Sequence, residues 1–531
     1  MKKIISIAHS AVTAKLVNAD RAAMLEVQRL LSYRVDGVEH MAAFKAGRWD
    51  GRSSFFDYKS STFPRGFVGM VSAGLQKAGY QVNIVKKPFP APLGAERPVV
   101  DAFGESERYG YQYQVTDRLV RHGQIIAQVA TGGGKSRIAQ LCTARISRPT
   151  LFLTTRGILM YQMAEKFEAM GKRTAILGDG SLQISKDVTC ATVQTIMSWL
   201  TEITPEAEME RELKSLKRRK VPEERWPSEM EMVESAKRKA LTQAAKRKKM
   251  IEVLKTFEFV ILEEAHESSG SGYFEILKHC EKAHYRLALT ATPFMKDDEE
   301  ANMRLMASSG PVAIRVTEEE LINKGILAKP YFKFLPLSAP PKKLFKTTPW
   351  QRAVELGVVK NDLRNDLIVE ECTRANKFGL SVMILVQRKE HGNALLEKLT
   401  FAGLKAAYIL GEDNQAERKA ALSALSSKSV DVLIGTTILD VGVDVPAVGM
   451  VILAGGGKAE VGLRQRIGRG LREKKDGSPN VAFIVDFDDD YNFHLKSHAK
   501  QRQSIIQSTP GFQENIVTDF DFKGLGLKEV A

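Results

Sequence analysis

Short apolar segments alternate with helical patterns along this chain, and this alternation constrains its fold more than any other feature. One series consists of the segments 124–129, 150–153, 259–262 and 285–289, and a second of 381–386, 430–435, 449–453 and 481–485. Strands that are apolar on both faces and are separated by helices build parallel sheets covered on both sides. We therefore predict an α/β fold with two tandem parallel-sheet domains.

Changes in sequence texture divide the rest of the chain. Its 531 residues are enough for roughly three domains. Residues 1–95 begin with a predicted strand, mix short apolar runs with Gly, Pro and basic residues, and end in closely spaced prolines, which predicts a small α+β domain. The other predicted parts are a first α/β domain at 105–328, a linker at 329–349, a second α/β domain at 350–490 and a C-terminal tail at 491–531.

The charge of the chain favours a polyanionic partner. The formal net charge is +15 and the sequence pI is about 9.4. Lys and Arg side chains release counterions when they contact phosphates, although such a surplus also occurs in proteins that bind no nucleic acid. The four cysteines include no close pair, which fits a reducing compartment and indicates neither a zinc site nor a disulfide framework. No segment approaches the ~18 apolar residues of a membrane helix, so we expect a cytoplasmic protein.

A highly charged segment at about 205–249 interrupts the first α/β domain. It is rich in helix-favouring residues and contains two basic runs, 217–220 and 246–249. One interpretation is a solvated helical hairpin stabilised by ion pairs between residues four positions apart. The other is a basic arm that contacts the backbone of a nucleic acid. Both interpretations stay open at this point.

A glycine-rich loop follows the first apolar strand and precedes an apolar helix. Its glycines allow backbone amides to turn toward the phosphates of a nucleotide, its lysine supplies a positive charge, and its serine hydroxyl can bind Mg²⁺. The strict pattern begins with Gly, whereas this loop begins with Val129, and a loop that merely turns the chain is the alternative. The residues predicted to bind the nucleotide are Thr131, Gly132, Gly133, Gly134, Lys135 and Ser136.

Two acidic residues stand at the end of a later strand of the first series. Glu263 and Glu264 follow the segment 259–262 directly. A carboxylate at that place can hold Mg²⁺ through water, and its neighbour can position or deprotonate an attacking water. We therefore assign Glu263 to the metal and Glu264 to the water. A further polar segment, 290–292, follows the next strand.

An arginine-rich segment at 465–472 lies in the second predicted domain. Its arginines offer charge for the γ-phosphate of a nucleotide bound to the first domain. A site divided between two domains can convert hydrolysis into relative domain movement. We expect arginines of this segment to serve that site.

In this order the segments resemble the motifs of the superfamily 2 helicases and translocases, over nearly all of residues 105–490. Tyr111-Gln112 resembles the adenine-reading Q motif, with Gln112 as the base contact and Tyr109 or Tyr111 as a stacking ring. Residues 263–266 stand where the family has its DEAD or DEAH box, and 465–472 resembles motif VI. The family usually has Asp at the position of Glu263, so the longer side chain is a departure. The resemblance implies two RecA-like domains that bind ATP and Mg²⁺.

The remaining motifs extend this resemblance to nucleic-acid contacts. Segments 154–156, 192–195, 290–292, 386–388 and 435–444 resemble motifs Ia, Ic, III, IV and V. By analogy with the family, Arg469 and Arg472 are arginine fingers, and Gln465 faces the nucleotide or its metal-bound water. The same analogy assigns Gly442 and Asp444 of motif V to the nucleotide site. The residues implied to contact nucleic acid are Arg156, Thr192, Gln194, Arg388 and Thr436.

The amino-terminal segments 44–52, 56–58 and 63–68 resemble the front domain of phage helicases of the UvsW type, which act on branched DNA. Basic side chains beside aromatic ones can present charge and stacking surface to DNA. Arg48, Lys59 and Arg65 are therefore predicted to contact the DNA backbone. Phe55 and Phe67 are interpreted as core residues of the small domain.

Together these features predict an ATP-dependent DNA helicase or translocase that unwinds or branch-migrates forks and junctions in replication, recombination or repair. The resemblance implies 3′-to-5′ movement, sequence-independent binding of branched or single-stranded DNA, and action in a host cytoplasm or nucleoid if a phage encodes the chain. The alternatives are an RNA helicase, a translocase subunit of a restriction system, and a binding scaffold that no longer hydrolyses ATP. The intact Lys135, Glu264, Arg469 and Arg472 argue against the scaffold.

Overall fold

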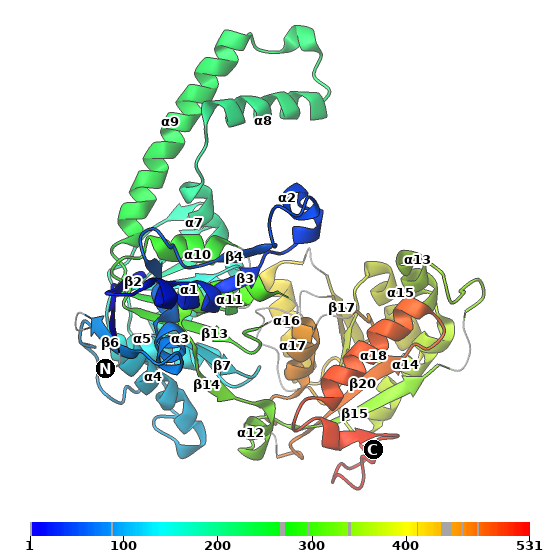
Figure 1. Ribbon diagram of the computed structural model, residues 1–531. Coiled ribbons are helices and arrows are strands. Elements are labelled where there is room, and N and C mark those ends of the chain that lie inside the picture. The colour runs from blue at the N-terminus through cyan, green and yellow to red at the C-terminus, as the bar shows by residue number, and fades with distance from the viewer. Residues whose placement is uncertain are drawn as a thin grey trace. The chain divides into compact units, whose positions relative to one another are not determined.

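The computed structural model describes residues 3–86, 89–265, 271–294, 298–337, 341–410, 413–436, 448–457, 460–474 and 477–530. Of residues 86, 271, 415, 460, 461, 465, 466 and 469 it describes the backbone only. Two compact units make up the chain (Figure 1). Unit 1 comprises Met1–Gln128 and Lys135–Arg315, and unit 2 comprises Val129–Gly134 and Val316–Ala531.

The large sheet of unit 1 has the strand order β10-β9-β11-β8-β12-β13-β7-β14. The pairs from β9 through β7 are parallel, whereas β10 runs antiparallel to β9. Its strands, in chain order, are β7 (Gln124–Val129), β8 (Thr150–Thr154), β9 (Thr174–Gly178), β10 (Ser181–Leu182), β11 (Val188–Thr192), β12 (Phe259–Glu263), β13 (Tyr285–Thr290) and β14 (Val312–Val316). The strands β8, β11, β12 and β13 are buried at every residue, as their apolar sequences predict.

Helices connect these strands. They are α4 (Gly110–His122), α5 (Lys135–Ile146), α6 (Gly157–Ala169), α7 (Val193–Leu200), α10 (Ser271–Lys278) and α11 (Glu299–Ser309). Buried residues of α7 and α10 pack with residues of β8 and β12 in one hydrophobic cluster. The predicted parallel α/β architecture is thus confirmed for this part of the chain.

The amino-terminal module has a four-stranded sheet of order β5-β2-β1-β6 and a separate pair, β3 with β4. Its elements are β1 (Ile4–His9), β2 (Thr13–Val17), α1 (Arg21–Leu30), β3 (Ser32–Arg34), α2 (Ala42–Lys45), β4 (Arg52–Ser54), β5 (Thr62–Pro64), α3 (Val68–Lys77) and β6 (Gln81–Lys86). Its core cluster includes Met303 and Ala307 of α11. Gly66 lies so close to α11 that an added Cβ would approach the Met306 carbonyl oxygen to 2.0 Å. The small α+β domain therefore shares a core with the rest of unit 1.

The charged insertion forms a helical hairpin that projects from the sheet of unit 1 (Figure 1). Helix α8 (Pro205–Arg218) is capped by Thr204, whose hydroxyl accepts a hydrogen bond from the Ala207 amide. Helix α9 (Glu229–Leu254) begins with a capping box between Ser228 and Glu231. The hairpin extends five residues beyond the predicted end at 249, because α9 continues to Leu254 and packs against the core there.

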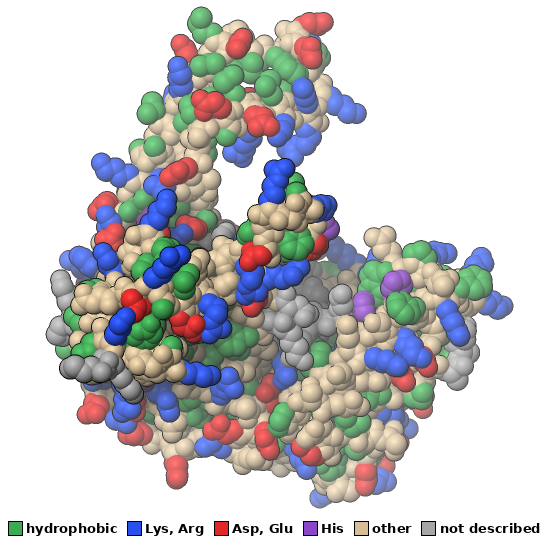
Figure 2. All heavy atoms as spheres, in the orientation of Figure 1, with side chains coloured by type: hydrophobic (Ala, Val, Ile, Leu, Met, Phe, Trp, Pro, Cys, Tyr) green, Lys and Arg blue, Asp and Glu red, His purple; other side chains and the backbone are tan. Residues whose placement is uncertain are grey.

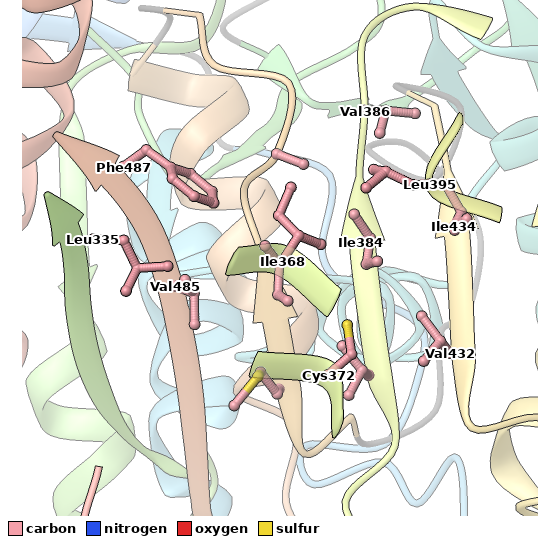
Figure 3. Packing of buried hydrophobic residues seen from close by; sticks show 14 of the residues in the cluster. Leu335, Ile368, Cys372, Ile384, Val386, Leu395, Val432, Ile434, Val485 and Phe487 are labelled. Carbon is pink, nitrogen blue, oxygen red and sulfur yellow. The ribbon is translucent and has the colours of Figure 1, made fainter. Parts of the chain in front are cut away.

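Unit 2 contains a sheet of order β17-β18-β16-β19-β20-β15-β21, and its pairs are parallel. Its strands are β15 (Lys329–Pro336), β16 (Val382–Leu385), β17 (Ala406–Ile409), β18 (Val432–Gly435), β19 (Met450–Ile452), β20 (Val481–Asp488) and β21 (Ile516–Val517). Its helices are α12 (Glu318–Asn323), α13 (Trp350–Val354), α14 (Asp362–Lys377), α15 (Lys389–Phe401), α16 (Gln415–Ser426), α17 (Glu460–Gly470) and α18 (Phe493–Gln507). Figure 3 shows the core: Ile368 and Cys372 of α14 face strand residues such as Ile384 and Val485.

Two predicted boundaries need correction. The predicted linker 329–349 begins with strand β15, which pairs with β20 over all eight of its residues. Its two prolines are typical of a break, yet Pro330, Phe332 and Leu335 are buried and the strand is paired along its whole length. The predicted tail is also part of unit 2, because β21 pairs with β15 and α18 contributes Leu495 to the core.

Within the described ranges, no helix combines the length and the apolar character needed to span a bilayer.

Candidate active site

The parallel sheet of unit 1 brings the predicted motifs of that unit to one edge. Neighbouring strands β11, β8, β12, β13 and β7 run in the same direction, so their carboxyl ends lie side by side. Thr192 pairs with Thr154, Glu263 with Leu289, and Thr290 with Gln128. The segments 154–156, 192–194, 263–264 and 290–292 therefore all follow the same edge, as does the loop after β7. Open α/β sheets bind ligands at that edge.

The glycine-rich loop has the backbone that its sequence requires. Gly132 has a φ of 86° and Gly134 a φ of 78°, a left-handed region that favours glycine. A Cβ on Gly133 would lie 2.6 Å from Cγ1 of Val129. Helix α5 starts at Lys135 directly after the loop, so the partial positive charge of its amino terminus adds to the lysine charge. The loop is thus a cradle that fits phosphate.

The two carboxylates lie where β12 ends. Glu263 is 7% exposed, and its Oε2 atom has no hydrogen-bond partner among the described residues. Burial raises the pKa of Glu263, as does the Glu264 charge, whereas the charges of Lys135 and Lys166 lower it. Within the described ranges, no group of three potential metal ligands is found. Mg²⁺ usually retains waters and phosphate oxygens, so a single buried carboxylate and a serine fit it.

Glu264 has an unusual backbone. Its φ is 48°, in the left-handed region that residues other than glycine rarely adopt. Such strain is commonly held at functional sites, where the surrounding structure compensates for it. Glu264 is half-buried and its Oε2 atom is buried, whereas Glu263 is enclosed more completely.

A buried arginine holds the predicted base contact. Nη1 of Arg137 donates a hydrogen bond to Oε1 of Gln112 at 2.6 Å, and Nε2 of Gln112 donates to the Tyr111 hydroxyl at 3.3 Å. The Arg137 guanidinium also donates to both carboxylate oxygens of Asp101, at 2.6 and 3.0 Å. The central carbon of this guanidinium, Cζ, lies 5.8 Å from the ring centroid of Tyr109. The role of Gln112 as a base contact stays a prediction.

Sequence reasoning missed Arg137 and Asp101. Arg137 directly follows the lysine and serine of the phosphate loop, but its position on an apolar helix indicated no specific partner. Asp101 lies in a segment between the predicted domains, where nothing in the sequence marks it. The only signal was a charged residue next to Ser136 at the start of a buried helix.

Two segments predicted to contact nucleic acid are joined to each other. Nε2 of Gln194 donates a hydrogen bond to the Thr155 carbonyl oxygen at 2.9 Å. The Arg156 amide donates to the Thr154 hydroxyl at 3.3 Å, at the start of α6. The hydroxyls of Thr192 and Thr195 lie 2.8 Å apart. The bond from Gln194 joins the two strand-end turns at the sheet edge, and the other two contacts each lie within one turn.

The third polar segment, 290–292, is hydrogen-bonded to the neighbouring strand β7. The Thr292 amide donates to the Thr290 hydroxyl at 3.2 Å, and Nε2 of Gln128 donates to the Ala291 carbonyl oxygen at 3.3 Å. The Thr292 hydroxyl is buried and has no hydrogen-bond partner among the described residues. This segment therefore connects β13 with β7, the strand that leads into the phosphate loop.

The predicted residues of unit 2 are described only in part. Thr436 follows β18, and Arg388 is exposed at the start of α15. Arg472 is half-buried and forms an isolated bridge with Leu327. His266, Gly442 and Asp444 lie outside the described residues, as do the side chains of Gln465 and Arg469. The completion of the nucleotide site by these arginines stays a prediction.

One predicted DNA contact in the amino-terminal module is corrected. Arg65 is only 5% exposed, and its Nη1 donates to the His284 carbonyl oxygen at 3.0 Å. Its guanidinium also lies over the ring of Phe89, with 4.7 Å to the centroid, so it anchors the module to the sheet of unit 1. Arg48 and Lys59 are exposed and stay candidates. Phe67 is buried, as predicted.

Comparison with known families gives three matches along the chain. Residues 105–295 match the sequence model of the family described as type III restriction enzyme, res subunit. Residues 363–474 match the helicase conserved C-terminal domain. Residues 5–85 match the family described as DNA helicase UvsW, N-terminal.

Individual relatives are distant. The ATP-dependent DNA helicase uvsW of Enterobacteria phage T4 is 22% identical over 505 residues, which is 91% of this chain and 90% of the phage protein. A helicase of the Sulfolobus islandicus filamentous virus is 23% identical over 270 residues, 48% of this chain. The alignment spans 47% of the viral protein, so the chain matches about half the length of that relative.

A solved structure shares the fold. A fragment of an HsdR subunit of a type I restriction enzyme from Vibrio vulnificus superposes with a TM-score of 0.50 and 17% sequence identity. The superposition covers 72% of this chain and 64% of that chain.

Proposed function

We propose that this protein is a motor that acts on branched DNA. The chain belongs to the superfamily 2 helicases, which hydrolyse ATP, and it carries a UvsW-type amino-terminal domain. In this proposal ATP hydrolysis drives the unwinding or branch migration of forks and junctions during replication, recombination or repair. The DNA is bound without sequence preference, and the protein acts in the cytoplasm of a host cell.

One observation carries the proposal: the strand register of unit 1. It aligns Glu263 and the phosphate loop with Thr154 and Thr192 at one sheet edge. A protein that only binds and hydrolyses a nucleotide needs Glu263 and the phosphate loop, but not Thr154 and Thr192. The presence of polar turns after β8 and β11, joined by the bond from Gln194 to Thr155, supports a second ligand next to the nucleotide. This arrangement suits an enzyme whose hydrolysis depends on a bound polymer.

Each residue has a chemical task in this proposal. ATP supplies the free energy of hydrolysis, and Mg²⁺ supplies positive charge to its phosphates. The loop amides of 132–134 and the Lys135 ammonium hold the β- and γ-phosphates. Ser136 and Glu263 would hold the metal. The Glu264 carboxylate orients the attacking water and accepts its proton. Arg469 and Arg472 would stabilise the charge that develops on the γ-phosphate.

DNA as the bound polymer is supported by the amino-terminal domain. The family matched over residues 5–85 is named for a DNA helicase. The phage relative, whose alignment covers 91% of this chain, is also named as a DNA helicase. The net charge of +15 suits binding of the protein to DNA phosphates. Contacts to phosphates do not depend on the base sequence. Affinity should therefore fall steeply with salt and vary little with sequence.

The test is ATP hydrolysis measured at one fixed salt concentration with single-stranded DNA, duplex, fork, four-way junction and RNA. We expect the fork and the junction to stimulate turnover more strongly than linear duplex. The Lys135→Ala variant is the control, because every stimulated rate must disappear with it. Stimulation by RNA alone, or no stimulation by any polymer, would overturn the proposal.

A translocase subunit of a restriction system is the second candidate. The family matched over residues 105–295 is described as a subunit of a type III restriction enzyme, and the superposed Vibrio vulnificus chain is named as a subunit of a type I restriction enzyme. The same assay separates the two, because a duplex translocase is stimulated by linear duplex as strongly as by forks.

A further inference from the structure

Unit 2 carries a surface that the predicted motifs do not use. It is formed by the loop 341–349, helix α13 and the first turns of α18, and we call it the aromatic–lysine surface. Phe345 is 69% exposed and Phe493 is 71% exposed. In the space-filling view, histidine, hydrophobic and basic side chains lie together over α13 (Figure 2). Two large rings exposed to this degree do not belong to the core.

The backbone beneath these rings is held firmly. Asn492, at the start of α18, is 1% exposed. Its Nδ2 donates hydrogen bonds to the carbonyl oxygens of Phe345, Lys346 and Thr348, at 2.9, 3.2 and 3.1 Å. The Phe493 amide donates to the Lys346 carbonyl oxygen at 3.0 Å. The loop and the helix therefore present Phe345 and Phe493 from adjoining, ordered backbone, which lowers the entropic cost of binding.

Further rings continue the surface. The rings of Trp350 and His498 have centroids 4.3 Å apart, and His494 lies 6.5 Å from Trp350. The ring of His494 is also 5.7 Å from that of Phe493. Trp350 and both histidines are half-buried. These contacts link the exposed ring of Phe493 to a row of aromatic side chains.

Positive charge surrounds the rings. Lys342, Lys343, Lys346 and Lys500 are exposed and form no ion pair with the side chains that the structure describes. Lys496 pairs with Asp490. The hydrogen bond from Lys496 lowers the pKa of Asp490, and the charges of Lys500 and Lys346 lower it further. Lys346, Lys496 and Lys500 therefore act on the Asp490 carboxylate, and the exposed Lys342 and Lys343 add further positive charge to the loop.

We propose that the aromatic–lysine surface binds single-stranded nucleic acid, with bases stacked on Phe345 and Phe493 and phosphates held by Lys342, Lys343 and Lys346. Exposed rings beside unpaired lysines are the combination that binds single strands without reading their sequence. A duplex fits less well, because its bases already stack on each other and hide their faces. The inference deepens the proposed function, on which it rests, by adding a holding site for a displaced strand.

The test compares two phenylalanine variants in the full chain. Phe345→Ala with Phe493→Ala removes both exposed rings. Phe401→Ala is the matched control, because Phe401 is 97% exposed on α15 and belongs to no ring contact among the described residues. Binding of an oligothymidine and of a duplex of equal length is measured by fluorescence anisotropy without nucleotide. We expect the double variant to bind the oligothymidine at least about 10-fold more weakly, with duplex affinity and the control unchanged.

A second measurement tests the lysines. The triple variant Lys342→Ser, Lys343→Ser, Lys346→Ser should lower the slope of log affinity against log salt by about 2 for the oligothymidine. If the wild-type protein binds DNA but the phenylalanine variant binds the oligothymidine normally, this inference fails and the proposed function stands. That result would also be expected of a surface that binds a protein partner. If the wild-type protein binds no nucleic acid, the proposed function itself fails.

Discussion

The side-chain amide of Gln194 donates a hydrogen bond to the backbone carbonyl oxygen of Thr155, 2.9 Å away. Gln194 lies in the first turn of α7, and Thr155 follows strand β8. The bond therefore joins two turns that are 39 residues apart in the chain and that are both expected to face nucleic acid. It offers a direct route by which a bound strand can order this edge of the sheet.

Replacing Gln194 with Ala should weaken coupling between nucleic acid and hydrolysis. We expect DNA-stimulated ATP turnover to fall about five-fold, which corresponds to the loss of one hydrogen bond of about 1 kcal/mol, while basal turnover is unchanged. The matched control is Gln140→Ala, because Nε2 of Gln140 also donates to a carbonyl oxygen at 2.9 Å, that of Lys166, but this bond joins α5 to α6 and not the turns after β8 and β11. Equal effects of both variants would contradict the assignment.

Glu264→Gln should abolish ATP turnover and spare ATP binding. The amide keeps the size of the carboxylate but cannot accept a proton from water, so a loss of at least about 100-fold is expected. Lys135→Ala should weaken ATP binding itself, because it removes a charge from the phosphate loop. Calorimetric titration with ATP and a phosphate-release assay separate the two variants. Hydrolysis that survives Glu264→Gln would show that another group handles the water.

The tip of the helical hairpin should contribute to DNA affinity. Lys217, Arg218, Arg219 and Lys220 are exposed and form no ion pair among the described side chains, whereas Lys239 pairs with Glu208 and Glu212. Changing the four tip residues to Ser should lower the salt slope for duplex DNA by about 1 to 3. Changing the already paired Lys214 and Lys239 to Gln is the control. An unchanged slope in the tip variant identifies the hairpin as a solvated element only.

Arg65 and Arg48 should behave differently when replaced by Ala. Arg65 is buried, and burial lowers its pKa to about 10. Because Arg65 donates a hydrogen bond to the His284 carbonyl oxygen, its replacement by Ala leaves that oxygen without its donor. We expect Arg65→Ala to destabilise unit 1 by about 2 kcal/mol and to leave the salt slope of DNA binding unchanged. Arg48→Ala should leave the stability of unit 1 unchanged and lower the salt slope of DNA binding. Thermal unfolding and salt titration of both variants check this, and a stable Arg65→Ala protein with weakened DNA binding would contradict it.

Unit 2 should lose stability as the pH falls below about 6.5. Burial lowers the pKa of His391 to about 3, and its Nε2 lies 2.9 Å from Oδ1 of Asn365. The unfolded chain takes up this proton near pH 6.5 but the folded chain does not, so acid favours unfolding. The expected loss from this residue is about 2 kcal/mol between pH 7 and 5. Urea unfolding of wild type and His391→Gln should show the steeper pH dependence in wild type; equal slopes would refute it.

Most strands could be predicted, because a strand buried on both faces must be apolar throughout, and the segments 150–153 and 259–262 show this directly. The strand β15 was missed for a local reason, since its two prolines imitate a break while the pairing partner β20 lies about 150 residues later. The bond from Arg137 to Gln112, which are 25 residues apart, is hidden as well, because a buried arginine reveals its partner only in the folded chain.

The sequence by itself determined the parallel α/β fold, the phosphate loop and the order of the motifs, since each depends on residue type and spacing within one short segment. The tertiary structure alone decided which side chains are available. It buried Arg65 against Phe89, enclosed Glu263 beside Lys135, and left Phe345 and Phe493 exposed on a firmly held backbone. The physical reason is that exposure and pairing depend on contacts between segments far apart in the chain, whereas local pattern depends only on neighbours.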